Sequence, residues 1–514
     1  MKKVLKYIVV GVALLPLALA GCTSNFDEYN TNPYEPTTLD VRQFFAEMQD
    51  CFASPEENPY QRNATFWACF GGYITAPHSW SRSTLYSTWN IDDDWNKWTV
   101  DWYYTKFYPS YFQVENYTEK QGQYYALAVL HRVAVMQYVL NLQGPLPYSQ
   151  VTNGKYAVPY DDEKTAWHKM FDDLDFAIAE LSNAIDPNYR PMSGYDRVYN
   201  GDYEKWVKFA NSLKLRMAIR ISGVDAEYAK QQALSAINHP IGVMTSNSDS
   251  AYDNLNGRFP NGFYQVGTGW GEARLNASIT AYMNGYEDPR REKLFTEATV
   301  ADTSGYIGVR SGIAGANKAD FAEYSQWNVT STTPIPFFVA AEVAFLRAEG
   351  ALLGWDMGGT AQHWYEEGIR LAFSEVGAQG AEDYIANSTA KPGNYVDPKN
   401  SAYNYNNRST IPIAWSAVSS NEEHLEQIIT QKWIANFPNG LEGWCDFRRT
   451  GYPYLFPAYN NQSTQGVTNE RQQRRLRFSL SEYQTNNANV TAAVGMLSNG
   501  QDSDNTDLWW AKKN

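Results

Sequence analysis

The fold of this chain is constrained most by a series of segments in which apolar residues recur every three or four positions. One segment carries Trp167, Phe171, Leu174, Ile178 and Leu181 at this spacing, which places them on one face of an α-helix. The same periodicity marks segments at 127–138, 206–217, 225–238, 340–353, 360–372 and 425–437. The sequence therefore predicts a mostly α-helical protein.

Several of these helices are joined by short connections, which favours helix pairs. The clearest pair is 340–353 and the helix that begins at Thr360. Ala344, Ala348 and Ala351 are small enough to let two helices approach closely. Helix pairs of this kind stack in tetratricopeptide-like (TPR-like) units, but no full repeat signature is present. An ordinary helical domain is the alternative.

Three long stretches, 240–282, 301–333 and 378–414, lack helical periodicity. Loops of this length inside a compact protein usually carry function. We therefore expect a helical scaffold with a loop-rich side that binds a ligand.

The first 22 residues have the pattern of an export signal. Lys2, Lys3 and Lys6 precede an apolar stretch, which ends in Leu19-Ala20-Gly21-Cys22. This pattern predicts a signal peptide over 1–21 and a lipid on Cys22, with a plain signal peptide or a membrane helix as alternatives. Residues 22–40 are polar and predict a lipidated tether, and 41–514 would form the folded domain.

The composition of the chain disfavours some classes of binding partner. The formal net charge of −14 disfavours nucleic acid and anionic lipid. The chain has 17 Trp and 37 Tyr, more than a core alone requires, which predicts exposed aromatic surfaces. Beyond Cys22 it carries Cys51, Cys69 and Cys445, so an internal pairing leaves one cysteine over. Either a Cys51–Cys69 disulfide or three buried free cysteines would fit.

Short motifs along almost the whole chain resemble the SusD/RagB family of outer-membrane nutrient-binding lipoproteins, most closely its SusD-like branch. The matching motifs are Phe26-Asp27-Glu28-Tyr29-Asn30-Thr31-Asn32-Pro33, Gly144-Pro145-Leu146-Pro147-Tyr148-Ser149, Ala210-Asn211-Ser212-Leu213-Lys214-Leu215-Arg216-Met217-Ala218, Asp288-Pro289-Arg290, Leu346-Arg347-Ala348-Glu349, Tyr365-Glu366-Glu367-Gly368-Ile369, Gln431-Lys432-Trp433-Ile434-Ala435 and Arg448-Arg449-Thr450-Gly451-Tyr452-Pro453. Their order and spacing, together with the lipidation pattern, make the resemblance specific.

The resemblance implies four TPR-like units on one side of a mostly α-helical fold and a ligand site on the loop-rich side. It implies a lipid-anchored protein of the outer membrane that faces the cell exterior. It also implies a SusC-type TonB-dependent outer-membrane transporter as partner. The ligand would be a glycan or, in some members, a peptide. The family has no catalytic residues and no cofactor to carry over.

A glycan site needs an exposed aromatic ring for the apolar face of a sugar and polar groups for its hydroxyls. The densest aromatic stretch lies between residues 73 and 102, and the later loops add further rings. The candidate ligand-binding residues are Trp80, Arg82, Tyr86, Trp89, Asn90, Trp270, Tyr306 and Trp327. We expect Trp270 and Trp327 to be more exposed than the others, because their loops are glycine-rich or polar.

Core packing is the alternative for many of these rings. Trp95, Trp98 and Trp102 are spaced as one helix face and are expected to be buried. The preceding run Asp92-Asp93-Asp94 lacks the glycine and the alternation of a calcium loop, so we expect it to cap a helix rather than bind metal.

The charged motifs favour structural roles. Asp288-Pro289-Arg290 suits a loop held by an ion pair, and Arg448 and Arg449 suit buried pairing with Glu342 or Glu349. Among functions, capture of a glycan competes with capture of a peptide and with a surface glycoside hydrolase. The hydrolase would need two carboxylates flanking an aromatic cleft, and no hydrolase motif is present in the sequence.

Overall fold

The computed structural model describes residues 40–53, 67–77, 86–255, 257–313 and 317–511. The chain divides into two compact units, Met1–Gln43 and Phe44–Asn514. In the first unit only residues 40–43 are described, where the Arg42 guanidinium donates to the Asp40 carboxylate at 2.9 Å. Cys22, the signal peptide and most of the tether lie outside the described residues. The rest of this section concerns the second unit.

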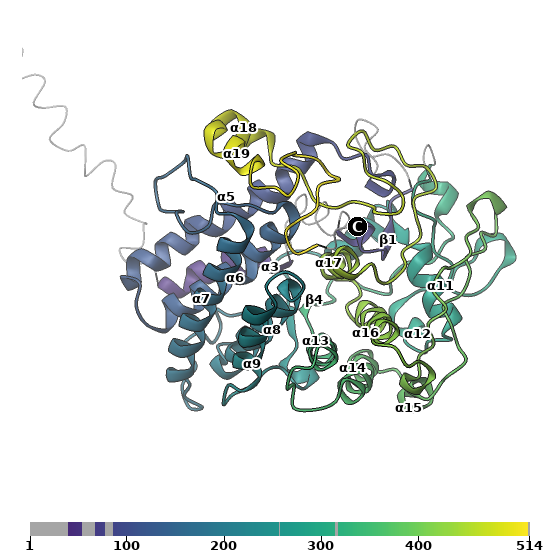
Figure 1. The fold of residues 1–514 in the computed structure, drawn as a ribbon, viewed down its shortest axis with the longest axis horizontal. Helices are drawn as coiled ribbons and strands as arrows, with labels where there is room; N and C mark the ends of the chain where they lie inside the picture. The colour runs from purple at the N-terminus through teal and green to yellow at the C-terminus, as the bar shows by residue number, and fades with distance from the viewer. Residues whose placement is uncertain (1–39, 54–66, 78–85, 256, 314–316, 512–514) are drawn as a thin grey trace, which may run out of the picture. The chain divides into compact units, whose positions relative to one another are not determined.

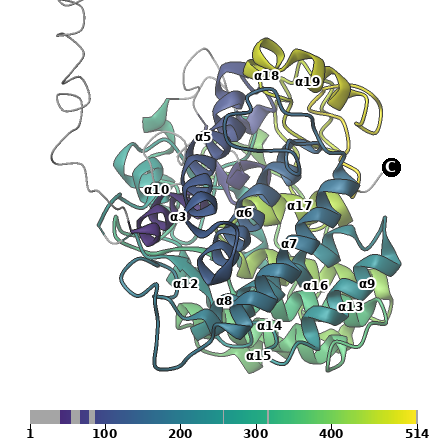
Figure 2. The same cartoon turned by 90° about the vertical axis from the view of Figure 1, so that its left-hand side faces the viewer.

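The second unit is mostly helical, and helices that are neighbours in sequence pack side by side (Figures 1 and 2). The longer helices are α3 (Phe45–Ala53), α5 (Asp93–Thr118), α6 (Gly122–Gln143), α7 (Glu163–Asn183), α8 (Tyr203–Ile221), α9 (Ala226–Ile237), α13 (Ala340–Leu352), α14 (Ala361–Val376), α16 (Asn421–Ala435) and α17 (Gly440–Thr450). Shorter helices are α10 (Gly262–Tyr264), α11 (Ala277–Gly285), α12 (Arg291–Leu294), α15 (Ala381–Ile385), α18 (Leu480–Thr485) and α19 (Asn487–Val494). Contacts of α6 with α7, α8 with α9 and α13 with α14 give the expected TPR-like pairs.

Local signals in the sequence set the ends of these helices. Asp162 accepts from the Thr165 amide at the start of α7, and Asp202 accepts from the Lys205 amide at the start of α8. Ser420 begins α16 and forms a reciprocal capping box with its third helical residue. The predicted apolar face of α7 is buried, so the periodicity correctly identified the core side of this helix.

Close helix contact depends on small residues, as expected for α13 and α14. Ala344 and Ala348 are buried on α13. Across from them, a Cβ added to Gly368 of α14 would lie 2.7 Å from the ring of Phe345. Any larger residue at Gly368 would push the two helices apart.

Among the described residues, α6 is the one helix whose length and composition would suit a membrane span. Its apolar window lies almost entirely inside the protein, where it contacts α3, α5 and α7. This burial is that of a core helix.

Two short antiparallel sheets join distant parts of the chain. β1 (Ile74–Thr75) pairs with β3 (Arg274–Leu275), and β2 (Ala251–Asp253) pairs with β4 (Ile335–Phe338). Next to the first sheet, the Asn276 side-chain amide donates to Thr75 Oγ1 at 2.8 Å and to Ser311 Oγ at 2.7 Å. This buried amide therefore joins three distant segments of the chain, those that contain Thr75, Asn276 and Ser311.

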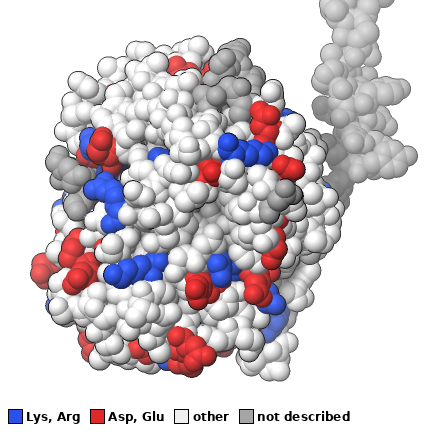
Figure 3. Space-filling view, turned by 90° about the vertical axis from the view of Figure 1, so that its right-hand side faces the viewer, with Lys and Arg blue, Asp and Glu red and all other residues white. Residues whose placement is uncertain are grey.

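The side of the unit that carries α11 and α12 consists largely of loops, and Figure 3 shows this face as a surface. The predicted loop stretches 240–282, 301–333 and 378–414 contain only short helices and strands, apart from α11, which begins within the first of them. The helical scaffold and the loop-rich side are therefore both present.

The three described cysteines, Cys51, Cys69 and Cys445, are free and buried. The disulfide alternative for Cys51 and Cys69 is therefore wrong. Burial raises the pKa of the Cys69 thiol to about 12, so this side chain behaves as a small apolar residue.

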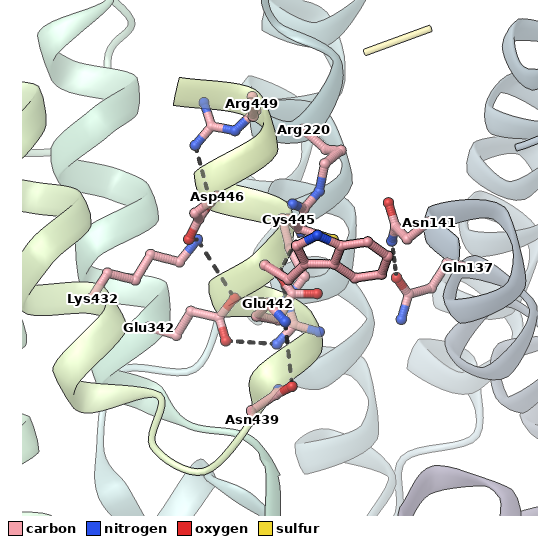
Figure 4. Close-up of polar contacts among 12 residues, drawn as sticks. Gln137, Asn141, Arg220, Glu342, Lys432, Asn439, Glu442, Cys445, Asp446 and Arg449 are labelled. Carbon is pink, nitrogen blue, oxygen red and sulfur yellow. Dashed lines mark hydrogen bonds and ion pairs between the residues drawn. The ribbon is translucent and has the colours of Figure 1, made fainter. Parts of the chain in front are cut away.

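A network of buried charges joins α8, α13, α16 and α17 (Figure 4). Arg216 of α8 donates twice to Glu342 of α13, at 2.7 Å each. Lys432 of α16 lies 3.0 Å from the Asp446 carboxylate of α17, and Arg449 lies 3.2 Å from it. Burial alone would raise the pKa of Asp446, but Lys432 and Arg449 hold it at about 2.

The charged motifs mostly take the predicted structural roles. Arg449 Nη2 donates to Glu349 at 2.9 Å, and Arg290 pairs with Asp288 at 2.6 Å, both buried. Arg448 differs, because among the described residues it has no carboxylate partner. Its guanidinium donates to the carbonyls of Asn141 and Arg474 and lies over the Trp444 ring at 3.6 Å.

One half-buried carboxyl gives a pH-dependent prediction. Glu375 accepts from the Tyr252 hydroxyl, and burial raises its pKa from the usual 4.5 to about 7. The folded state therefore holds a proton that the unfolded state releases between pH 4.5 and 7, and stability falls as the pH rises through this window. Glu375→Gln should remove that loss, so the variant gains stability relative to the native protein between pH 5 and pH 8. Urea unfolding at both pH values tests this, and an equal difference at both would contradict it.

Candidate functional site

The β1–β3 ladder joins the segment that precedes the predicted aromatic residues near position 80 to the segment that follows Trp270. The strands are antiparallel, with Thr75 opposite Arg274. The chain therefore leaves β1 through Ala76 and Pro77 at the same end of the sheet at which Ala273 leads into β3. Trp270 lies just before this point, and residues 78–85 just after Pro77. Trp80 and Arg82 belong to 78–85 and lie outside the described residues.

Trp270 is an exposed ring on a tightly held turn. Its side chain is 39% exposed. Its backbone amide donates to the Gln265 carbonyl at 2.8 Å, and Lys318 donates to the Trp270 carbonyl at 3.3 Å. Gly271 follows with φ at +67°, a conformation that favours glycine. The backbone is thus fixed while the ring faces solvent, which is what a stacking platform for a ligand requires.

Trp327 differs from its expected exposed position. It is 2% exposed, and the Phe263 ring meets it edge-on at 5.9 Å. A Cβ added to Gly267 would lie 2.4 Å from the Trp327 ring, so the glycine lets the backbone lie directly against the indole. Trp327 therefore supports the turn that carries Trp270 and presents no free face in this structure.

Tyr306 is half-buried on the same loop-rich side. Its ring meets Phe295 at 6.2 Å, and the Arg291 guanidinium lies 5.5 Å from the ring centre. Phe295 in turn pairs with Trp327 in a short bridge. Tyr306 and Trp270 are thus attached to one packed group of aromatic residues, and both retain exposed atoms.

The candidate residues near position 90 are less exposed to solvent than Trp270. Tyr86 and Trp89 are buried, and Trp89 lies 6.0 Å from the Phe70 ring. Asn90 is half-buried and remains accessible. In the helix that follows, Trp102 is buried as expected, and α5 begins at Asp93 within the predicted cap.

A second aromatic cleft was not predicted. It has a volume of about 510 Å³ and lies between α5, α18 and the segment 147–158. Tyr104 and Phe112 line it from one face of α5, and Tyr156, 94% exposed, stands at its edge. The spacing of Tyr104, Tyr108 and Phe112 along a helix is a signal that could have pointed to this cleft.

Charge on the face that carries α11 and α12 is mixed. Figure 3 shows acidic and basic side chains interspersed on it, with broad uncharged areas between them. Close to Trp270, the Glu272 carboxylate is neutralised by Lys318 at 2.8 Å. Among the described residues, no group of three or more His, Cys, Asp or Glu is placed to hold a metal ion. Beside Trp270, the charges of Glu272 and Lys318 offset one another, which suits a neutral ligand better than a highly charged one.

Comparison with known proteins places the whole chain in one group. Residues 24–511 match the family described as SusD-like, "Susd and RagB outer membrane lipoprotein". A SusD-like protein from Bacteroides thetaiotaomicron is 47% identical, with a TM-score of 0.88 over 92% of this chain and 99% of that one. A chitin-binding SusD homologue from Flavobacterium johnsoniae is 36% identical, with a TM-score of 0.88 and the same coverage of both chains. No curated protein matches the chain.

Proposed function

The chain belongs to the SusD-like family of outer membrane lipoproteins, and we propose that it captures a glycan on the loop-rich face around Trp270. The observation that carries this proposal is the exposed indole of Trp270 on a backbone fixed by Lys318 and Gln265. Aromatic rings held in this way bind the apolar face of a sugar without an ordering cost. The chitin-binding relative supports a glycan as the ligand class.

Polar side chains among the candidate residues and beside Trp270 would supply the hydrogen bonds to such a ligand. Tyr306 offers a hydroxyl, Asn90 an amide and Glu272 a carboxylate oxygen beside Lys318. Trp80 and Arg82 lie outside the described residues and follow β1 in the sequence, and we keep them as candidates on the grounds of sequence alone. Trp327, Tyr86 and Trp89 would act by supporting the backbone beneath the ligand, since all three are buried.

Delivery to a transporter completes the proposal. A lipid on Cys22 would hold the protein at the outer membrane, with the body on the exterior face. A SusC-type TonB-dependent transporter would receive the ligand, and energy for uptake would come from the transporter. Retention of the glycan at the transporter mouth raises its local concentration there. The protein itself would supply binding and no bond cleavage.

An array of glycans and peptides tests the ligand class, using the protein that begins at Thr23. We expect binding to at least one neutral glycan and recovery of that glycan intact after incubation. Binding to peptides alone would replace the glycan by a peptide in this proposal. Release of shorter sugars would show a hydrolase and contradict it.

A further inference from the structure

A cleft of about 450 Å³ lies apart from the residues around Trp270. It is bounded by the end of α17, the segment that follows α17 through Pro457, and parts of the segments near residues 405–408 and 469–474. Tyrosines and arginines dominate its lining. The residues that matter here are Tyr405, Arg408, Arg448, Tyr454, Arg471 and Arg474.

The cleft is cationic although the chain as a whole has a net charge of −14. Four arginines line it, and Glu470 is the one carboxylate among its lining residues. Arg471 and Arg474 both pair with a single carboxylate, that of Asp507, with Arg474 Nε at 2.7 Å. Among the described residues that line the cleft, arginines therefore outnumber carboxylates.

Arg408 is the exposed arginine of the cleft. It is exposed, and the structure gives it no ion pair with any described residue. Its guanidinium lies 5.3 Å from the centre of the Tyr454 ring, and both residues line the cleft. A guanidinium held in this way can bind a carboxylate or sulfate through two hydrogen bonds.

The buried guanidinium of Arg448 adds positive charge at the wall of the cleft. It is fully buried, and burial lowers its pKa to about 10, which leaves it protonated at neutral pH. Its hydrogen bonds go to carbonyl oxygens and a sulfur atom, so its charge is not cancelled by a described carboxylate. A buried positive charge without a counter-ion favours an anion nearby.

The backbone of the cleft wall is strained at one point. Gln472, between Arg471 and Arg474, has φ at +53°, which is uncommon for a residue with a side chain. Its side-chain amide donates to the Leu455 carbonyl at 3.4 Å, and its backbone amide donates to the Thr468 carbonyl at 2.8 Å. Such strain is often found at sites that bind ligands, and here it lies in the segment that carries Arg471 and Arg474.

We propose that this cleft binds a carboxylate or sulfate group carried on a sugar ring, as in a uronic acid or a sulfated hexosamine. Arg408 would bind the acidic group, the other three arginines would add positive charge beside it, and Tyr454 and Tyr405 would pack against the ring. The remote acidic residues of the protein oppose such a ligand only weakly, because charges more than about 8 Å apart are screened at physiological salt. This site does not depend on ligand capture at Trp270.

Calorimetry with small acidic sugars tests the proposal. The probes are trigalacturonate and N-acetylglucosamine 6-sulfate. Their neutral counterparts are α-1,4-linked galactotriose and N-acetylglucosamine, and inorganic sulfate is tested alone. We expect at least one acidic probe to bind more tightly than its counterpart. Arg408→Gln should weaken that binding about tenfold, since it removes a charge-assisted contact. Arg190→Gln, at an exposed arginine that pairs with Asp202, should leave it unchanged.

Local hydrogen exchange locates the probe. Slower exchange in peptides covering 404–409, 450–457 and 468–474 is expected with the acidic sugar and not with its neutral counterpart. If inorganic sulfate binds and neither acidic sugar does, the cleft is a site for a free anion only, and the proposal is overturned. Equal binding of neutral and acidic sugars, or unchanged affinity in Arg408→Gln, would also overturn it. Protection by the acidic sugar confined to residues 262–276 would overturn the proposed anionic site and would leave the proposed glycan capture at Trp270 unaffected.

Discussion

Asp446→Asn is expected to lower the free energy of unfolding by about 3 kcal/mol. The Asp446 side chain is 2% exposed and lies between Lys432 and Arg449. Asparagine has the same shape but no charge, so Lys432 would keep only the carboxylate of Glu342, at 3.9 Å. Removing one partner of a buried charge network costs more than the pair contributes, because the remaining charge stays out of water. Denaturation in urea at pH 7 measures the change.

The pKa of Asp446 gives a second route to the same expectation. A carboxyl with a folded pKa of about 2, against 3.8 in its ordinary state, is stabilised in its charged form by the fold. That stabilisation is complete above pH 4 and disappears as the pH falls through 2. The difference between native protein and Asp446→Asn should therefore shrink in strong acid.

The control for this prediction is an exposed ion pair. Glu382 accepts from Arg370 at 2.7 Å on the surface of α15, and Glu382→Gln should lower the free energy of unfolding much less than Asp446→Asn does. Equal effects of the two substitutions would contradict a stabilising role for the buried network. Asp446→Asn that remains folded should bind glycan normally, because the network lies within the helices and not at the ligand face.

Trp270→Ala is expected to weaken glycan binding roughly tenfold, which corresponds to about 1.4 kcal/mol. The indole is exposed and its turn is fixed through backbone contacts of Gln265 and Lys318, so truncation removes the ring and preserves the loop. Trp270→Phe should restore part of the affinity, since a smaller ring still stacks. Affinity electrophoresis or calorimetry with the glycan found on the array measures both variants.

Two tyrosines serve as matched controls for the loss of an exposed ring. Tyr189→Ala removes a ring that is away from any described cleft and should leave binding unchanged. Tyr156→Ala removes the ring at the edge of the 510 Å³ cleft and should also leave it unchanged. A loss in Tyr156→Ala with normal binding in Trp270→Ala would move glycan capture to that cleft.

The helices that were predicted from sequence have local signals. The apolar faces of α7 and α8 follow from residues three or four apart, and their N-terminal caps are aspartates just before them. Charge alone indicated that Arg449 and Arg290 would be paired, and both pairs are present. The family resemblance was carried by these structural motifs rather than by ligand residues.

Exposure of the aromatic rings was less predictable, because it depends on contacts between distant segments. Trp327 follows a polar stretch, yet Gly267, sixty residues earlier, provides the space that buries its ring. Arg448 and Arg449 are adjacent in the sequence but differ in partner, because helix α17 directs only Arg449 toward Glu349. Tyr156 gave no signal as a single residue, and its cleft exists only where α5 and α18 meet.

Hydrogen exchange in the presence of the captured glycan tests the central claim most directly. The protein beginning at Thr23 would be compared with and without the tightest-binding neutral oligosaccharide from the array. Capture at the loop-rich face predicts slower exchange in peptides covering 262–276 and 304–310, and loss of this protection in Trp270→Ala. Protection found only in 149–160, or equal protection in Trp270→Ala, would contradict the account.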